Sequence, residues 1–152
     1  MGRVTEQDAE TAVLPTFDVR GQVALVTGAA RGLGRAIALA LAAAGADVAL
    51  GLHDAGADGG AAAEIQALGQ RALPLQMDIG QADQIGPAIA AAVAWFGRLD
   101  ILVNNAGIAP RNPAEDVTED DLDATLAVNL KAQAASLITG ETVLVDGGWT
   151  AR

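Results

Sequence analysis

The amino-acid sequence predicts an α/β fold, in which helices cover a doubly wound, largely parallel sheet of the Rossmann type. Short apolar runs that suit strands alternate with longer alanine-rich stretches that suit helices, and this alternation is typical of βαβ units. A glycine-rich segment at residues 27–34 follows the first such strand. The length of 152 residues fits one domain. We therefore expect an N-terminal tail at residues 1–20 and a single domain over residues 21–152.

The first predicted strand is the β-branched run at residues 23–26, and a helix follows at residues 32–44. Apolar residues recur every four positions in this helix, at Leu33, Ile37 and Leu41. Gly45 favours the end of the helix, because glycine readily adopts the left-handed conformation found there.

The second strand is predicted at residues 47–52 and the third at residues 72–78. Pro74 favours an edge position for the third strand, because proline has no N–H for a neighbouring strand. The helix between these strands, at residues 54–68, is weakened by its glycines: Gly56, Gly59 and Gly60.

A third helix is predicted at residues 83–96, with Pro87 in its first turn and Gly97 at its end. Its apolar residues share one face: Ile85, Ile89, Val93 and Phe96. A fourth strand is expected at residues 99–104.

A longer helix is predicted at residues 118–137, where Thr118 and Asp121 form a pattern close to a capping box. Its apolar stripe consists of three leucines: Leu122, Leu126 and Leu130. The apolar run at the end of the chain predicts a last strand at residues 142–147.

The charge and the cysteine content exclude several classes of partner. The net charge is −10, from 9 basic and 19 acidic residues, which argues against binding to nucleic acid or an anionic membrane surface. The absence of cysteine excludes disulfides and thiolate metal sites, and we expect no metal. No apolar run approaches the length of a membrane span. We expect a cytoplasmic protein.

The glycine-rich segment has the spacing of a phosphate cradle. Gly28 permits a tight turn, Gly32 lets the backbone approach a pyrophosphate, and Gly34 allows the helix to pack closely on the strand. The N-terminus of the following helix offers free N–H groups to an anion. The alternative is a plain glycine-rich turn.

Further motifs follow in order along the chain: Asp78-Ile79, Asn104-Asn105-Ala106-Gly107, Val128-Asn129-Leu130, and a tail from Ile138 to Trp149. Together with T-G-x-x-x-G-x-G at residues 27–34, they resemble the classical short-chain dehydrogenase/reductase family. The resemblance implies an oxidoreductase that uses NAD(P) to interconvert alcohols and ketones. The implied cofactor-binding residues are Gly28, Arg31, Gly32, Leu33, Gly34, His53, Asp78, Ile79, Asn105, Ala106 and Gly107.

The resemblance gives some of these residues individual roles. The side chain of Asn105 would bond to backbone groups, and Ala106 and Gly107 would leave room for ribose and nicotinamide. Asp78 would accept a hydrogen bond from adenine, or it would only cap the next helix. Trp149 would lie at an oligomer interface, or it would only cover the core, and the family's use of the long helix for subunit contacts suggests a homo-oligomer.

Cofactor preference depends on the end of the second strand. By resemblance, the acidic residue of NAD-binding members falls on Leu52, which cannot bind a ribose hydroxyl. His53 follows it, and Arg31 in the glycine loop suits a 2′-phosphate. Asp54 favours NAD instead. We expect NADP rather than NAD.

The residues that the family uses for chemistry are missing. The chain contains no tyrosine, so the family's general acid/base is absent. Lys131, the only lysine, lies too early for the family's lysine, and Ser136, the only serine, is in the tail. Asn129 alone matches the catalytic set, and we expect its side chain to bond locally or to face solvent.

The order of the motifs indicates that one block of the family pattern is deleted, with the join near residues 132–135. Two strands, their helices and a substrate lid would take on the order of 100 residues. We expect about five strands, in the order 3-2-1-4 with the last strand, at residues 142–147, beside strand 4. The alternative is an open edge at strand 4, which would favour pairing between chains.

Three hypotheses about function follow. The first is a truncated family member that binds the dinucleotide without efficient turnover of alcohols or ketones. The second is an active oxidoreductase whose acid/base has moved, for example to His53 or Asp146. The third is a non-enzymatic interaction module, or the product of a damaged or engineered gene.

Overall fold

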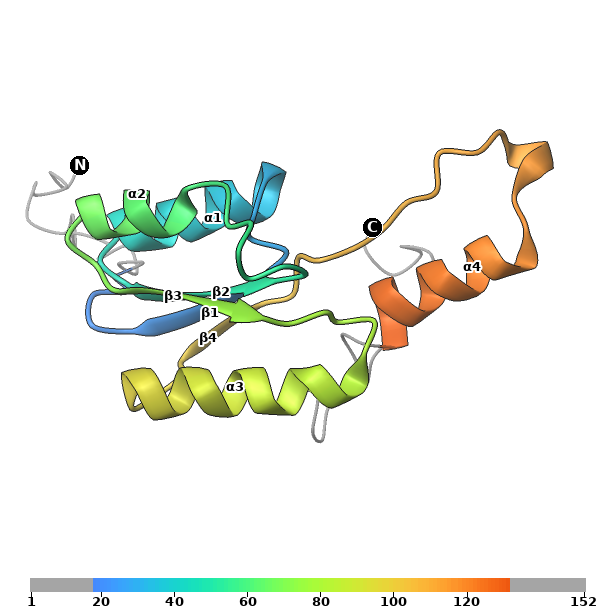
Figure 1. Ribbon diagram of the computed structural model, residues 1–152. Helices are drawn as coiled ribbons and strands as arrows, with labels where there is room; N and C mark the ends of the chain where they lie inside the picture. Colours follow the sequence, from blue (N-terminus) through green and yellow to red (C-terminus); the bar gives the residue numbers. More distant parts are fainter. Residues whose placement is uncertain (1–17, 132–152) are drawn as a thin grey trace, which may run out of the picture.

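Four parallel strands form one sheet in the order β3-β2-β1-β4 in the computed structural model, which describes residues 18–131 (Figure 1). The strands are β1 (Val23–Thr27), β2 (Asp47–Leu52), β3 (Ala72–Gln76) and β4 (Ile101–Val103). The predicted order of the first four strands is confirmed, and β3 with its proline lies at the edge. The strand predicted at residues 142–147 lies outside the described residues.

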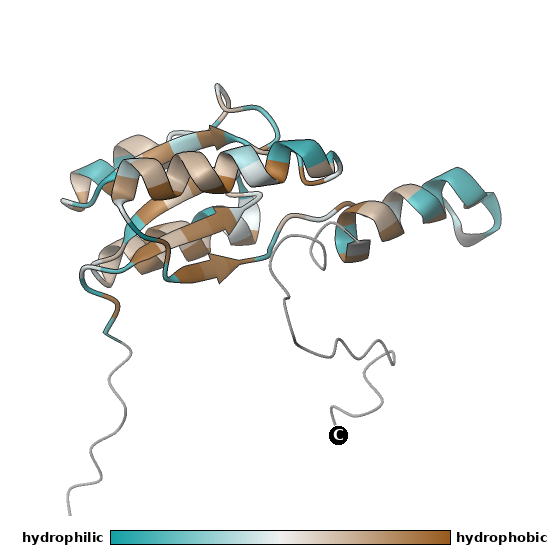
Figure 2. Cartoon of the chain, turned by 90° about the horizontal axis from the view of Figure 1, so that it is seen from below, coloured by the Kyte–Doolittle hydropathy of each residue, from teal (hydrophilic) through white to brown (hydrophobic). Residues whose placement is uncertain are grey.

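Three helices cover the two faces of this sheet: α1 (Gly32–Ala43), α2 (Ala61–Ala67) and α3 (Ala82–Phe96). Helices α1 and α2 lie on one face and α3 on the other, so the sheet is doubly wound as predicted (Figure 1). The strands of the described part are largely apolar, as sheets covered on both faces require (Figure 2).

Alternate strand residues serve two separate hydrophobic clusters. Leu25 and Ala49 pack in the cluster that contains α3, whereas Val26 and Leu50 pack in the cluster that contains α1 and α2. All four side chains are fully buried. The period of two in the strand side chains therefore distributes one sheet between two cores.

The buried face of α1 differs from the predicted stripe of large residues. Its buried positions are Gly34, Ala38 and Ala42, whereas Leu33 is 77% exposed. Small side chains bring the helix axis close to β1 and β2, and the larger residues then flank the contact. Helix α3 keeps most of its predicted apolar face, because Ile85 and Phe96 are buried together with Ala88 and Ala92, and only Val93 is exposed.

Helix α2 begins at Ala61 rather than at residue 54, so the predicted helix was too long at its N-terminal end. Gly59 and Gly60 both have positive φ and cannot belong to a right-handed helix. Asp58 caps the shortened helix, because its carboxylate accepts the N–H groups of Gly60 and Ala62, each at 3.0 Å.

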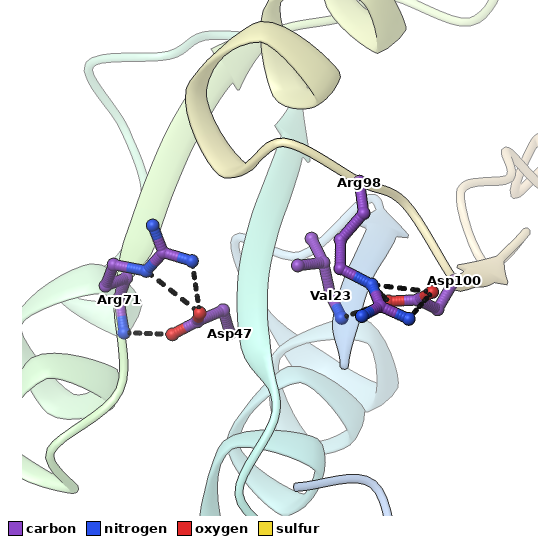
Figure 3. Close-up of polar contacts among 5 residues, drawn as sticks. All are labelled: Val23, Asp47, Arg71, Arg98 and Asp100. Atoms are coloured by element: carbon purple, nitrogen blue, oxygen red, sulfur yellow. Dashed lines mark hydrogen bonds and ion pairs between the residues drawn. The ribbon is translucent and has the colours of Figure 1, made fainter. Parts of the chain in front are cut away.

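Two arginine–aspartate pairs lie at the amino ends of the strands and form hydrogen bonds with backbone N–H groups there (Figure 3). The carboxylate of Asp100 accepts the backbone N–H of Val23 at 2.8 Å and is held by the guanidinium of Arg98. The carboxylate of Asp47 likewise accepts the backbone N–H of Arg71 at 2.7 Å and two bonds from its side chain. Each carboxylate thus extends the ladder beyond the last backbone pair.

The segment after β4 leads through the 3-10 turn η1 (Ala114–Asp116) to α4 (Glu119–Leu126) and the π-helical turn η2 (Ala127–Lys131). Helix α4 extends beyond the carboxyl ends of the strands (Figure 1). The predicted capping box of Thr118 and Asp121 is confirmed. Leu122 is 53% exposed, so the leucine stripe is largely uncovered within residues 18–131, and assembly through this helix stays a prediction. No helix of the described part is long and apolar enough to cross a membrane.

We predict that Asp100→Asn lowers the free energy of unfolding at pH 7. The hydrogen bonds from Arg98 and from the N–H of Val23 hold the pKa of the Asp100 carboxyl below its ordinary value of 3.8. Its stabilising effect is therefore complete above the unfolded pKa and is lost as the pH falls through the lower folded pKa.

Urea unfolding from pH 7 to pH 2 checks this. The free energies of unfolding of the variant and the wild type should converge below about pH 4. Asp123→Asn on α4 is the matched control, because no hydrogen bond to its carboxylate is found within residues 18–131. A difference for Asp100→Asn that stays constant down to pH 2 would contradict the assignment.

Candidate functional site

A cleft of about 560 Å³ opens at the carboxyl ends of the strands. Its walls come from the loop between β1 and α1, from the ends of β2 and β3, and from the segment that follows β4. All eleven residues that the sequence predicted as cofactor-binding line this one cleft: Gly28, Arg31, Gly32, Leu33, Gly34, His53, Asp78, Ile79, Asn105, Ala106 and Gly107.

Thr27, the last residue of β1, connects the two central walls of the cleft. Its side chain is 2% exposed, and its hydroxyl oxygen accepts the backbone N–H groups of Asn105 and Ala106, each at 3.0 Å. The same hydroxyl donates to the carbonyl of Val103 at 3.3 Å. The side-chain nitrogen Nδ2 of Asn105 in turn donates to the backbone carbonyl of Thr27 at 2.9 Å and lies 3.4 Å from the backbone carbonyl of Gly28. The predicted bonding of Asn105 to backbone groups is thus observed, and its partners lie at the end of β1 and in the residue that follows it.

The glycines of the loop are needed for two different reasons. Gly28 has a φ of +67°, and a Cβ there would lie 2.9 Å from the Cα of Ala106. Gly34 has an ordinary helical conformation, but a Cβ there would lie 2.4 Å from the carbonyl oxygen of Gly28 and 2.4 Å from the side-chain nitrogen of Asn105. Both glycines therefore allow the loop, α1 and the segment after β4 to pack against one another.

Gly32 leaves space on the side of the cleft. Its φ is +58°, and a Cβ there would meet no atom within 4 Å. No side chain of residues 18–131 caps α1 at this end, and its first turn contains no acidic residue. Free N–H groups, the positive end of the helix dipole and open space together fit an anionic group such as a pyrophosphate.

Arg31 stands at the start of α1 with an extended backbone and an exposed side chain. Four other arginines of the described residues form ion pairs with carboxylates: Arg20, Arg35, Arg71 and Arg98. Within residues 18–131, no carboxylate lies within 4.0 Å of the guanidinium of Arg31. Its positive charge is therefore available to a ligand in the cleft.

The end of β2 presents an apolar and a basic residue to the cleft. Leu52 is buried, whereas the side chain of His53 is 86% exposed, and its Nε2 lies 3.6 Å from the carboxylate of Asp78. The carboxylate of Asp54 accepts the N–H of Gly56 at 2.9 Å, and Asp54 does not line the cleft. The acidic residue that favoured NAD is therefore engaged in its own turn.

Asp78 lines the cleft and also caps the turn before α3. Its carboxylate accepts the side-chain amide of Gln81 at 2.8 Å and the backbone N–H of Gly80 at 2.9 Å. The bond from Gln81 is the main reason that the pKa of Asp78 is lowered, and the N–H of Gly80 and the nearby His53 act in the same direction. The carboxylate thus stabilises the turn before α3 without accepting an N–H group of the helix itself, and it remains at the cleft wall.

Asn129 is exposed, as one of its two predicted alternatives has it, but its side chain also makes hydrogen bonds outside its own helix. Its amide oxygen accepts the N–H of Ile108 at 2.9 Å, and its amide nitrogen donates to the carbonyl of Ile108 at 2.9 Å. A Cβ at Gly107 would lie 3.1 Å from the same amide oxygen. Asn129 therefore fixes the segment after β4 to the turn η2.

Several cleft residues were missed by the sequence analysis: Ala30, Met77, Ile108 and Val128. Three of them directly adjoin a motif residue that was selected, so their place in the chain was the available signal. Val128 belongs to the predicted Val128-Asn129-Leu130 motif, and its position at the cleft depends on how α4 and η2 fold back.

Within residues 18–131, no three His, Asp or Glu side chains are grouped so that they could hold a metal ion.

Comparison with known proteins adds a sequence relationship to this geometry. Residues 22–139 match the profile described as short chain dehydrogenase. D-Threitol dehydrogenase of Mycolicibacterium smegmatis is 44% identical over 145 residues, which cover 93% of this chain and 55% of that protein. The chain spans about half the length of the curated relatives that it matches.

Solved structures of similar proteins give the same picture. A short chain dehydrogenase from Burkholderia cenocepacia in complex with NADP has a TM-score of 0.73 and 44% identity, over 78% of this chain and 49% of that one. A short chain dehydrogenase from Mycobacterium paratuberculosis bound to NAD has a TM-score of 0.73 and 29% identity over the same shares.

We predict that Thr27→Val destabilises the fold more than Thr27→Ser does. Valine keeps the shape of threonine but removes the oxygen that Asn105 and Ala106 share as acceptor, which should cost about 2 kcal/mol or more. Serine keeps this oxygen and loses one methyl group, which should cost about 1 kcal/mol. Urea unfolding measures both, and an equal loss for the two variants would contradict the greater weight given to the hydroxyl bonds.

We predict that Gly34→Ala lowers stability by about 1–3 kcal/mol, since the added methyl group must displace Asn105 or the loop carbonyl. Gly86→Ala in α3 is the matched control, because a Cβ there meets no atom within 4 Å. Because Pro87 follows and disfavours the helical conformation of a residue that has a Cβ, the usual gain of about 0.5–1 kcal/mol for replacing a helical glycine is offset, and stability should change little. Thermal unfolding distinguishes the two, and a Gly34→Ala variant as stable as Gly86→Ala would contradict the close packing.

Proposed function

The chain belongs to the short-chain dehydrogenase family of oxidoreductases, and from that premise we propose that it binds a nicotinamide dinucleotide, preferably NADP(H), without efficient turnover of alcohols or ketones. The observation that carries the proposal is the gathering of the glycine loop, the end of β2, the end of β3 and the segment after β4 around one cleft. The dinucleotide, when bound, would supply hydride chemistry.

The arrangement of the strands divides the cleft into two halves. Because β2 and β4 flank β1 on opposite sides, the walls that follow them face each other across the glycine loop. The pyrophosphate would lie at the N-terminus of α1, beside Gly32. Adenine would lie beside Asp78 and Ile79, and the nicotinamide ribose beside the Asn105–Gly107 segment.

The preference for NADP(H) rests on the residues at the end of β2 and on the charge of Arg31 at the start of α1. Leu52 cannot accept a hydrogen bond from a ribose hydroxyl, and the carboxylate of Asp54 is engaged by the N–H of Gly56. Arg31 has a charge that no carboxylate of residues 18–131 neutralises, and His53 lies at the same cleft. A guanidinium suits a 2′-phosphate well.

The lack of turnover rests on the sequence. A hydride transfer to a carbonyl needs a proton donor within hydrogen-bond reach of the substrate oxygen, and the chain has no tyrosine to act as the family's donor. We ascribe this to a deletion between the Asn129 motif and the tail motif. The family-matching Asn129 makes backbone contacts to Ile108 that are needed whether or not the chain is active.

A displaced acid/base finds no support at His53. This residue follows β2, and the segment expected to hold the nicotinamide follows β4, on the other side of β1. Its Nε2 lies beside the carboxylate of Asp78, which belongs to the adenine half. The other candidate, Asp146, lies outside the described residues. The reading as a non-enzymatic interaction module is decided by the experiment below.

Isothermal titration of the full chain with NADPH and with NADH tests the proposal, followed by a turnover assay with a panel of alcohols and ketones. We expect binding of both dinucleotides, tighter binding of NADPH, and no hydride transfer above the rate without protein. Arg31→Met should raise the dissociation constant for NADPH by about tenfold and that for NADH by much less, since it removes a charge that pairs with the 2′-phosphate.

Each part of the proposal can fail separately. Absence of binding by either dinucleotide would favour the interaction module. Turnover that Gly28→Val abolishes would establish an active enzyme with a different acid/base. Equal affinity for NADPH and NADH would contradict the role given to Arg31.

A further inference from the structure

The backbone ladder between β2 and β3 ends at the cleft, and a side chain continues it. Leu52 and Gln76 are the last paired residues of the two strands, and the N–H of Met77 donates to the carbonyl of Leu52 at 2.7 Å. Beyond this bond the two segments separate: β3 is followed by Met77 and the turn to α3, and β2 by the loop to α2.

The amide of Gln76 bridges this divergence with two hydrogen bonds. Its nitrogen donates to the backbone carbonyl of His53 at 2.5 Å, and its oxygen accepts the backbone N–H of Ala55 at 3.0 Å. One planar amide thus satisfies a carbonyl and an N–H two residues apart, as a neighbouring strand would. No other side chain of residues 18–131 bonds to the backbone of His53 or Ala55.

The bridged segment carries the residues on which cofactor preference depends. His53 lines the cleft, while the adjoining turn holds Asp54, whose carboxylate accepts the N–H of Gly56. Gln76 is exposed and is not itself a lining residue of the cleft. Its two bonds therefore act on the cleft only through the position of the loop.

We propose that Gln76 is a positioning residue for cofactor selectivity, which holds the His53–Ala55 backbone so that His53 faces the cleft and Asp54 stays in its turn. The proposal rests on the proposed dinucleotide binding. Without this amide, the His53–Ala55 backbone loses two hydrogen bonds. This part of the cleft is where we expect the adenosine ribose, whose 2′-phosphate distinguishes NADPH from NADH. The pyrophosphate site at α1, which both dinucleotides share, is not touched by Gln76.

The test compares dissociation constants for NADPH and NADH by isothermal titration of the full chain. Gln76→Met keeps the length of the side chain and removes its hydrogen bonds. We expect it to weaken NADPH about fivefold, the equivalent of one net hydrogen bond, and NADH by less than about twofold. Gln66→Ala, an exposed glutamine of α2, is the matched control and should leave the ratio unchanged.

A double-mutant cycle tests whether Gln76 acts through His53. His53→Ala should lower the NADPH preference, and adding Gln76→Met to it should lower the preference no further. Hydrogen exchange at the Ala55 amide gives a readout without ligand, and Gln76→Met should accelerate it.

Equal weakening of NADPH and NADH by Gln76→Met would show a merely structural role and overturn the proposal. A Gln76→Met variant that binds both dinucleotides as the wild type does would overturn it as well. So would a double variant whose preference for NADPH is lower than that of His53→Ala. If the wild-type chain binds neither dinucleotide, the proposed function itself fails, and this outcome is distinct because the wild type alone reveals it.

Discussion

The junction between Thr27 and Asn105 is the interaction on which the rest of the structure depends. The buried hydroxyl of Thr27 accepts two N–H groups from the segment after β4 and donates to a carbonyl of β4, and the side-chain amide of Asn105 donates to the carbonyl of Thr27. These bonds fix how the segment after β4 meets the glycine loop. Since Gly34 has no room for a Cβ against Asn105, the same junction sets the position of α1. The two central walls of the cleft are therefore one unit.

Side chains complete the backbone ladder at both ends of this sheet. Asp47 and Asp100 accept strand N–H groups at the amino ends (Figure 3), while Thr27 and Gln76 bond to loop backbone at the carboxyl ends. A short parallel sheet has many backbone groups beyond its last pair, and each needs a partner. At the amino ends these bonds contribute only to stability. At the carboxyl ends the same kind of bond also shapes the cleft.

Binding and chemistry depend on different parts of this family's pattern. The features that fit a dinucleotide come from residues 27–108 together with the turn η2, and they are held by contacts that need no further strand. The proton donor of the family belongs to a later segment, and the sequence contains no tyrosine to replace it. Asn129 illustrates the separation, because it matches the catalytic set and yet serves here to hold Ile108. The contact of Asn129 with Ile108 depends on neither a tyrosine nor a bound cofactor.

The sequence by itself determined the order and type of the elements, since strand and helix periods are local and the glycine loop marks the first βαβ unit. It also determined which residues meet at the cleft, because the carboxyl ends of parallel strands share one edge. It did not determine the packed face of α1, where alanines rather than the large residues are buried, because the approach of a helix to a sheet depends on both surfaces. Only the tertiary structure revealed the partner of Asn129 and the bridge made by Gln76. Both bonds join residues about 20 positions apart, at distances that no local pattern encodes.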